Sequence, residues 1–142
     1  MGIKAFYGKN VQYIGPFAFY YCKSLETIDF PSIVDGGIIR FSNGNEYYLD
    51  FANTFTGCSL TSINTLSSYT GVFGREAFAY NYKLSSAIVP NVTELGESTF
   101  NGDSELTATN FDSVERIGDW CFSGCSKLSS ISFPSLSKKT FS

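Results

Sequence analysis

A 22-residue period of apolar residues, glycine and proline constrains the fold of this chain more than any other sequence feature. Its clearest copy is Val114–Leu136, VERIGDWCFSGCSKLSSISFPSL. One period earlier, Val92–Val114 places apolar residues, glycine and phenylalanine in the same slots. A period of this length predicts a solenoid, in which each unit packs on its neighbours because it cannot form a core alone.

Within each unit, one short stretch alternates as a β-strand does. In Leu25–Phe30 we expect Leu25, Ile28 and Phe30 to point inward, and Thr27 and Asp29 to point outward. Across the units the outward positions are short, polar and nearly uncharged. They form either a solvated sheet surface or a flat hydrogen-bonding surface for a peptide or glycan. The last such strand, Ser129–Phe133, is predicted to have an uncapped edge.

A central phenylalanine marks each unit, and its spacing shows one interruption. The series is Phe19, Phe55, Phe78, Phe100 and Phe122. The last three are 22 residues apart, whereas Phe55 follows Phe19 by 36. The extra residues contain two β-type runs around Ser42–Asn45, whose Asn-Gly pair suits a tight turn. We therefore predict an inserted β-hairpin near residues 37–50 that projects from the stack.

The slot three residues after each central phenylalanine always holds a short side chain that can bond to the backbone. Its occupants are Cys22, Cys58, Asn81, Asp103 and Cys125. We interpret these residues as a structural ladder with reduced, inert thiols. A disulfide between Cys22 and Cys58 is not expected, because the insertion separates them in sequence. No CxxC pair exists, so a metal site is not predicted.

Composition excludes several functional classes. The chain has no histidine, which removes Ser-His and Cys-His catalytic machinery, and we predict no catalytic residues and no cofactor. A net charge of −3 argues against nucleic acid as a partner. No apolar run is long enough for membrane insertion. We interpret residues 1–142 as a single repeat domain and as a fragment of a longer repeat protein.

The pattern IGxxAFxxCxxLxxIxFP occurs as Ile14–Pro31 and, with Cys121 in place of alanine, as Ile117–Pro134. It resembles the BspA-like leucine-rich repeat (LRR), also called the Treponema pallidum type. The resemblance implies an α/β LRR solenoid, β-dominated, with about five units of 22 residues. Short parallel strands would form one face, with turn or short-helix segments opposite. It also implies a non-enzymatic adhesion or protein-interaction module, extracellular or on the cell surface, with a protein or glycan ligand, possibly from a host.

Exposed tyrosine beside the interrupted repeat indicates where binding would occur. The predicted binding residues are Arg40, Tyr47 and Tyr48 on the hairpin, with Tyr20, Tyr21 and Tyr80 on the turn-rich side. Tyrosine gives a large contact area at a small entropy cost. The alternative is that some of these rings pack against the base of the hairpin. The alternative function is a structural spacer that associates end to end with copies of itself through Ser129–Phe133.

Overall fold

The structure, a computed structural model, describes residues 2–34, 38–40, 46–48 and 51–136. It consists of short strands joined by turns. In chain order the elements are β1 (Ala5–Tyr7), β2 (Thr27–Asp29), β3 (Ile38–Arg40), β4 (Glu46–Tyr48), η1 (Asn64–Leu66), β5 (Gly71–Phe73), β6 (Ser86–Ile88), β7 (Val92–Leu95), β8 (Ala108–Asn110) and β9 (Arg116–Ile117). Within the described residues, η1, a single 3₁₀ turn, is the one helical element. The segments opposite the first strands are therefore turns and not short helices.

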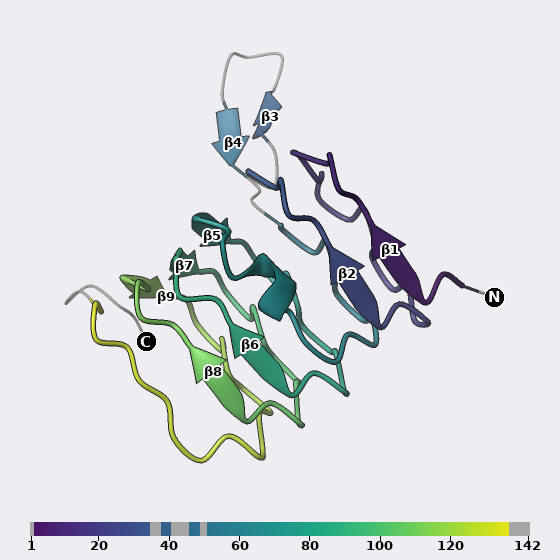
Figure 1. The fold of residues 1–142 in the computed structure, drawn as a ribbon. Coiled ribbons are helices and arrows are strands. Elements are labelled where there is room, and N and C mark those ends of the chain that lie inside the picture. Colours follow the sequence, from purple (N-terminus) through teal and green to yellow (C-terminus); the bar gives the residue numbers. More distant parts are fainter. Residues whose placement is uncertain (1, 35–37, 41–45, 49–50, 137–142) are drawn as a thin grey trace.

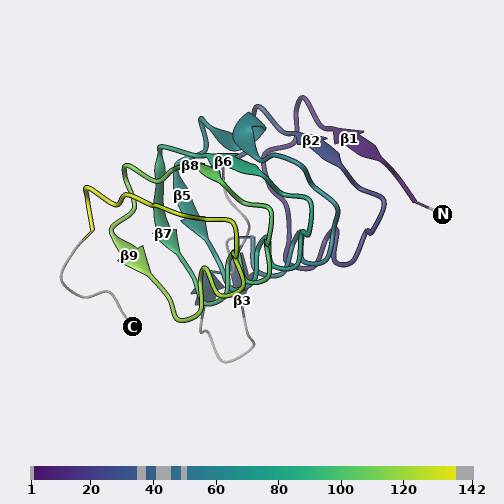
Figure 2. The same ribbon diagram turned by 90° about the horizontal axis from the view of Figure 1, so that it is seen from below.

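Parallel strands hold successive units side by side. In the first row, β1 pairs with β2 and β6 pairs with β8. In the second row, β7 lies between β5 and β9. Figure 1 shows the first row toward the viewer and the second row behind it, and Figure 2 shows both rows from below. The predicted parallel arrangement is confirmed.

The sequence pattern did not predict the second row of strands. Its central strand, β7, buries Val92 and Leu95 and leaves the two residues between them half-buried. The apolar slots were recognised in the sequence, but two buried residues separated by two others do not show period-2 alternation. The pattern alone therefore did not predict a strand.

The core is a column of aromatic rings that continues from one unit to the next. Phe19 stacks on Phe55 with ring centroids 5.3 Å apart, and Phe55 stacks on Phe78 at 5.5 Å. The column continues to Phe100 at 5.9 Å and then to Phe122 at 5.6 Å. Offset or stacked ring pairs at these separations contribute about 0.5–1.5 kcal/mol beyond their area burial. The inward residues of β2 and its flanks are also buried, as predicted, and Thr27 stays exposed.

The insertion leaves this column intact. Strands β3 and β4 pair antiparallel, with Ile38 opposite Tyr48, and they project beyond the stack in Figure 1. The predicted hairpin strands are confirmed, whereas the predicted turn at 42–45 lies outside the described residues. Because Phe19 and Phe55 stack directly, Cys22 and Cys58 belong to adjacent units. The insertion therefore separates these two cysteines in sequence but not in the stack, and all four cysteines are free thiols.

The unit after the insertion replaces a strand with a side-chain bridge. Only Ser62 forms a parallel bridge, to Ser86, before η1 begins at Asn64. The Asn64 side chain accepts the N–H of Ile88 at 2.7 Å and bonds to the Ser86 hydroxyl at 2.9 Å. An asparagine side chain thus supplies the bond that a strand backbone would otherwise supply.

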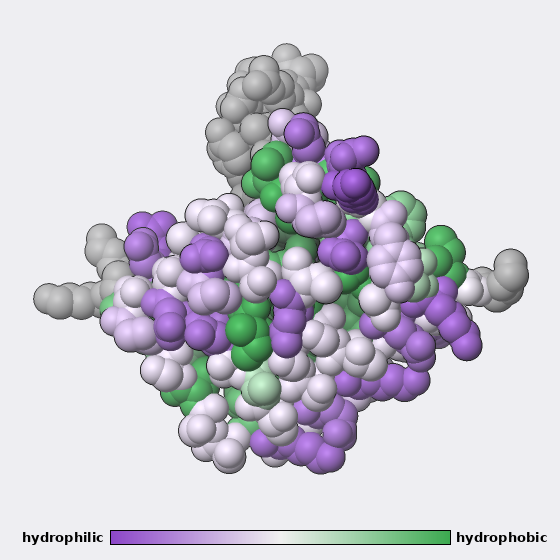
Figure 3. Space-filling view, viewed as in Figure 1, coloured by the Kyte–Doolittle hydropathy of each residue, from purple (hydrophilic) through white to green (hydrophobic). Residues whose placement is uncertain are grey.

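The predicted terminal strand at Ser129–Phe133 is wrong, because this segment has no strand structure. Within the described residues, no backbone hydrogen bond joins it to β8. The outer face of the first row is largely small and polar, as Figure 3 shows in white and purple with isolated green patches.

A glycine lies four residues before the central phenylalanine in every unit except that of Phe55, and this slot provides a stability test with an internal control. A Cβ at Gly118 would lie 2.6 Å from the backbone nitrogen of Glu97, whereas a Cβ at Gly15 would meet nothing within 4 Å. We expect Gly118→Ala to lower the free energy of unfolding by about 1–3 kcal/mol because of this overlap. Gly15→Ala, in the same slot, should change it by less than about 0.5 kcal/mol. Urea denaturation of both variants measures the difference, and equal stabilities would contradict the close approach.

Candidate binding surface on the turn side

Each turn has left-handed backbone at two positions, placed symmetrically around its central phenylalanine. Two residues before the ring, the positive-φ residues are Phe17, Asn53, Glu76, Ser98 and Trp120. Two residues after it, they are Tyr21, Gly57, Tyr80, Gly102 and Gly124. The repeated geometry is therefore a property of the turn and not of one residue type.

This geometry points backbone N–H groups toward the next turn. The N–H of Tyr21 donates to the carbonyl of Thr56 at 2.7 Å, and the N–H of Tyr80 donates to that of Asn101 at 2.8 Å. Gly57 and Gly102 make the equivalent bonds at 2.8 and 2.7 Å. Because buried backbone donors need partners, these bonds require the left-handed conformation at this slot in the first four units.

Glycine adopts left-handed backbone without a steric cost, whereas tyrosine does not. In the second slot, three units use glycine, but Tyr21 has φ 54° and Tyr80 has φ 61°. A bulky residue in this region costs about 1–3 kcal/mol. Two strained tyrosines at a position where glycine serves equally well for the backbone indicate that the side chains have a use of their own.

Tyrosine and glycine also depend on one another along this slot. A Cβ at Gly57 would overlap the ring of Tyr21, and a Cβ at Gly102 would lie 2.8 Å from Cδ1 of Tyr80. Each tyrosine ring thus covers the glycine of the following unit. The alternation Tyr21, Gly57, Tyr80, Gly102 fixes both rings over the turn surface.

Between the two rings is an open hollow of about 340 Å³, which we call the tyrosine hollow. It is lined by Tyr21, Lys23, Gly57, Cys58, Ser59, Tyr80 and Tyr82. Tyr21 is 45% exposed and Tyr82 is 64% exposed, so the rings of these two lining residues are accessible to solvent. Lys23 is the one charged lining residue, and the hydroxyl of Ser59 donates to its carbonyl at 2.6 Å.

The structure brings together part of the predicted binding set. Tyr21 and Tyr80 line the hollow, and Tyr20 lies against Tyr21 in an edge-on contact with centroids 4.6 Å apart. The side chains of the hairpin residues Arg40, Tyr47 and Tyr48 lie outside the described residues. Sequence reasoning did not include Tyr82 among the binding residues, or Lys23 and Ser59. The signal that could have marked the hollow is the substitution of tyrosine into a slot that is otherwise glycine.

The ladder residues bond to carbonyl groups of the central phenylalanines. The thiol of Cys58 donates to the carbonyl of Phe19 at 3.1 Å, and that of Cys125 donates to Phe100 at 3.2 Å. Asn81 Nδ2 donates to the carbonyl of Phe55 and also to that of Phe78, each at 2.9 Å. These bonds satisfy carbonyl groups at the turns, where the strand rows supply no donor.

The three buried thiols, two of the ladder and Cys121 beside it, are poor nucleophiles. Burial raises the pKa of Cys58, Cys121 and Cys125 to about 12 in each case. A thiol with a raised pKa holds almost no thiolate near neutral pH. Within the described ranges, no cluster of three acidic or cysteine side chains could hold a metal ion. The same part of the chain contains no helix with the length and apolar character needed to cross a membrane.

Asp103 is the one ladder residue with an unmatched polar atom. Its Oδ1 accepts the N–H of Asn81 at 2.8 Å, while Oδ2 is buried and has no partner among the described residues. Burial raises the pKa of Asp103 well above its usual value, against the lowering effect of the Asn81 N–H. The neighbouring ladder residue Cys125 offers a thiol and no positive charge. We therefore expect a neutral carboxylic acid, which can donate a hydrogen bond as Asn81 does.

Comparison with known proteins supports the repeat assignment. The family model described as "BspA type Leucine rich repeat region" matches residues 4–44 and 51–142 in six copies, where the spacing predicted about five. A leucine-rich repeat protein from Bacteroides ovatus has a similar solved structure, with 23% identity and a TM-score of 0.52. That alignment covers 91% of this chain but 36% of the other, so the chain spans about a third of its length. No curated protein matches.

The raised pKa of Asp103 gives stability a defined pH dependence. The unfolded chain loses this proton near pH 4, and the folded chain holds it to higher pH. The stabilising contribution is therefore complete below about pH 4 and is lost as the pH rises toward the folded pKa. Asp103→Asn, which keeps a donor at all pH values, should lack this decline.

At pH 7 we expect Asp103→Asn to raise the free energy of unfolding by on the order of 1–3 kcal/mol, because the wild-type carboxyl is ionised in the unfolded chain and must be protonated or desolvated on folding, whereas asparagine is neutral in both states. Urea denaturation between pH 4 and pH 9 measures both the stability and its slope. Asp112→Asn changes an exposed aspartate outside the ladder and is the control. Its stability should show the same pH dependence as that of the wild type. An Asp103→Asn protein that is less stable at pH 7, with the same slope, would contradict the neutral acid.

Proposed function

Because this chain belongs to the BspA-type leucine-rich repeat family, we propose that it is a protein-interaction module that binds its partner at the tyrosine hollow. The observation that carries the proposal is the left-handed backbone of Tyr21 and Tyr80. Strain of this kind persists at binding sites, where the side chain contributes to recognition. In the other units, glycine occupies this slot and no ring projects from it.

The chemistry of the hollow suits a side chain or short loop of a protein partner. Two tyrosine rings supply a rigid contact surface with few rotatable bonds, and Tyr82 enlarges it. At the rim, the Lys23 ammonium adds a donor and the Ser59 hydroxyl oxygen adds an acceptor. The backbone bonds of Tyr21 and Tyr80 hold the ring positions before a partner arrives, which reduces the ordering cost of binding.

We take the stacked units to be a solenoid and place it on a bacterial surface or in secreted material, as an adhesion module of a longer protein. The basis for this placement is the family. An extracellular partner, including a host protein or a glycan, would meet the hollow on the exposed turn side. The family is generally non-enzymatic, which agrees with binding as the function.

Replacement of the strained tyrosines by glycine tests the hollow directly. The Tyr21→Gly/Tyr80→Gly variant keeps the left-handed turn and removes both rings, so its fold should persist. We expect binding to any matrix protein captured from an immobilised panel to fall at least about tenfold, the loss expected of hot-spot rings worth more than 1 kcal/mol. Trp120→Gly is the matched control, because Trp120 is a left-handed, 64% exposed aromatic residue outside the hollow.

Tyr47→Ala/Tyr48→Ala is assayed on the same panel and asks whether the hairpin takes part. If the Tyr21→Gly/Tyr80→Gly protein binds like the wild type, the tyrosine hollow is not the site. If only the hairpin variant loses binding, the site lies on the hairpin. A wild-type chain that binds a glycan array and no protein would replace the protein partner with a carbohydrate.

A further inference from the structure

A second opening lies on the strand side, between β8 and the coil at Ser130–Ser132. Earlier units are joined here by bonds such as Ser85 N–H to the Thr61 carbonyl at 3.0 Å and Thr107 N–H to the Ser85 carbonyl at 3.1 Å. The equivalent bond, from the N–H of Ser129 to the carbonyl of Thr107, is absent among the described residues. The Ser129–Phe133 segment of the last unit has thus separated from the first row of strands, whereas β9 keeps that unit paired in the second row.

Among the described strands, β8 pairs along one edge only, with β6. Toward β6, the N–H of Ala108 donates to Ser85 at 3.1 Å, and the carbonyl of Asn110 accepts from Val89 at 3.1 Å. Bonds along a parallel strand alternate between its two sides, so the N–H and carbonyl of Thr109 face the opening. An unpaired strand edge of this kind is a template for an added strand.

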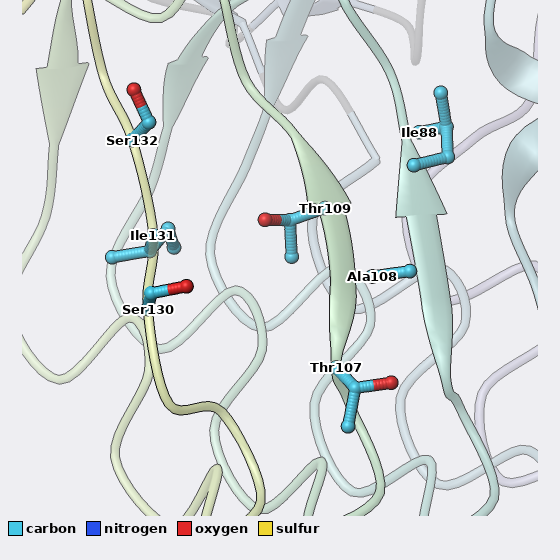
Figure 4. A pocket seen from close by; sticks show the side chains of 7 residues that line it. All are labelled: Ile88, Thr107, Ala108, Thr109, Ser130, Ile131 and Ser132. Carbon is cyan, nitrogen blue, oxygen red and sulfur yellow. The ribbon is translucent and has the colours of Figure 1, made fainter.

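The opening is a hollow of about 410 Å³, which we call the β8 slot. It is lined by Ile88, Thr107, Ala108, Thr109, Ser130, Ile131 and Ser132. Figure 4 shows the hydroxyl groups of Thr109 and Ser130 pointing into the space from opposite sides. Ile131 is 38% exposed, although Ile28 and Ala87 in the same inward slot are fully covered. The β8 slot therefore offers backbone groups, hydroxyl groups and an uncovered apolar side chain.

We propose that the β8 slot binds an extended, uncharged segment of a partner polypeptide, which adds as a strand between β8 and Ser130–Ser132. Among the described residues no charged side chain lines the slot, so a charge brought into it would have no partner there. Small and β-branched side chains fit a slot walled by threonine, serine and alanine. The hydroxyl groups can meet polar side chains of the same strand.

The flanking coil selects a single strand over the folded edge of a second copy. One free strand edge on another copy is that of β1, which already carries β2 along its other side. Ser130–Ser132 stands on the far side of the slot and occupies the place that β2 would need. An isolated strand, in contrast, can be flanked on both sides. This proposal concerns the strand side and does not depend on the tyrosine hollow.

A peptide copied from the chain itself is a suitable probe. The peptide LSSAIVP reproduces Leu84–Pro90, whose central residues pair with the opposite edge of β8. Hydrogen exchange measured by NMR should show that the Thr109 amide exchanges at least about tenfold faster than the Ala87 amide in the free chain, because the former is unpaired. Addition of the peptide should slow exchange at Thr109 at least about tenfold.

Two controls distinguish strand addition from nonspecific peptide binding. In one peptide, the backbone amide hydrogens at the positions copied from Ser86 and Ile88 are replaced by methyl groups. In a second peptide, those at the positions copied from Ala87 and Val89 are replaced. Strand pairing predicts that at least one of the two fails to protect Thr109. Ser130→Lys should weaken peptide binding at least about tenfold by placing a charge in the slot, whereas Ser126→Lys, outside the slot, should not.

Several results would overturn the proposal. Thr109 protected in the free chain as strongly as Ala87 would mean that the slot is closed. Strand addition would be excluded if LSSAIVP had no effect on exchange at Thr109. It would also be excluded if both N-methylated peptides protected Thr109 as well as LSSAIVP does. Dimers detected by light scattering, with Thr109 protected only in the dimer, would assign the slot to a second copy instead.

Discussion

The turns of this chain depend on backbone N–H groups that point from one unit to the next on either side of the phenylalanine column. The N–H of Phe78, for example, donates to the Thr99 carbonyl at 3.0 Å, and those of Glu76 and Tyr80 flank it at 2.9 and 2.8 Å. Left-handed residues before and after the ring make this spacing possible. The ring column, the polar ladder and the tyrosine hollow are all built on these repeated bonds.

A shared backbone requirement explains how structure and binding surface coexist in one turn. Where glycine occupies the second left-handed slot, the turn is complete and no ring projects from that slot. Where tyrosine occupies it, the same bond forms at the cost of about 1–3 kcal/mol of strain, and a fixed aromatic side chain is gained. Stacking of the phenylalanine rings and the hydrogen bonds to neighbouring turns offset this strain.

Much of the fold could be predicted from the period alone, because a buried slot recurs wherever units stack. The phenylalanine column, the parallel first row and the hairpin strands follow from spacing and Asn-Gly chemistry. The separation of Ser129–Phe133 could not be predicted, since its residues fit the strand pattern as well as those of β8 do. The hollow was only half-predicted: exposed tyrosines were visible in sequence, but the left-handed slot that aligns Tyr21 with Tyr80 becomes clear only in three dimensions.

The central claim is that Tyr21 and Tyr80 hold a backbone conformation that tyrosine rarely adopts. NMR of the intact chain measures it through the short distance between each residue's own amide hydrogen and Hα, which distinguishes positive from negative φ. We predict positive φ at both residues, near the 54° and 61° of the structure, in the absence of any partner. A negative φ at either tyrosine would remove the strain, and with it the argument that the hollow is a preformed binding site.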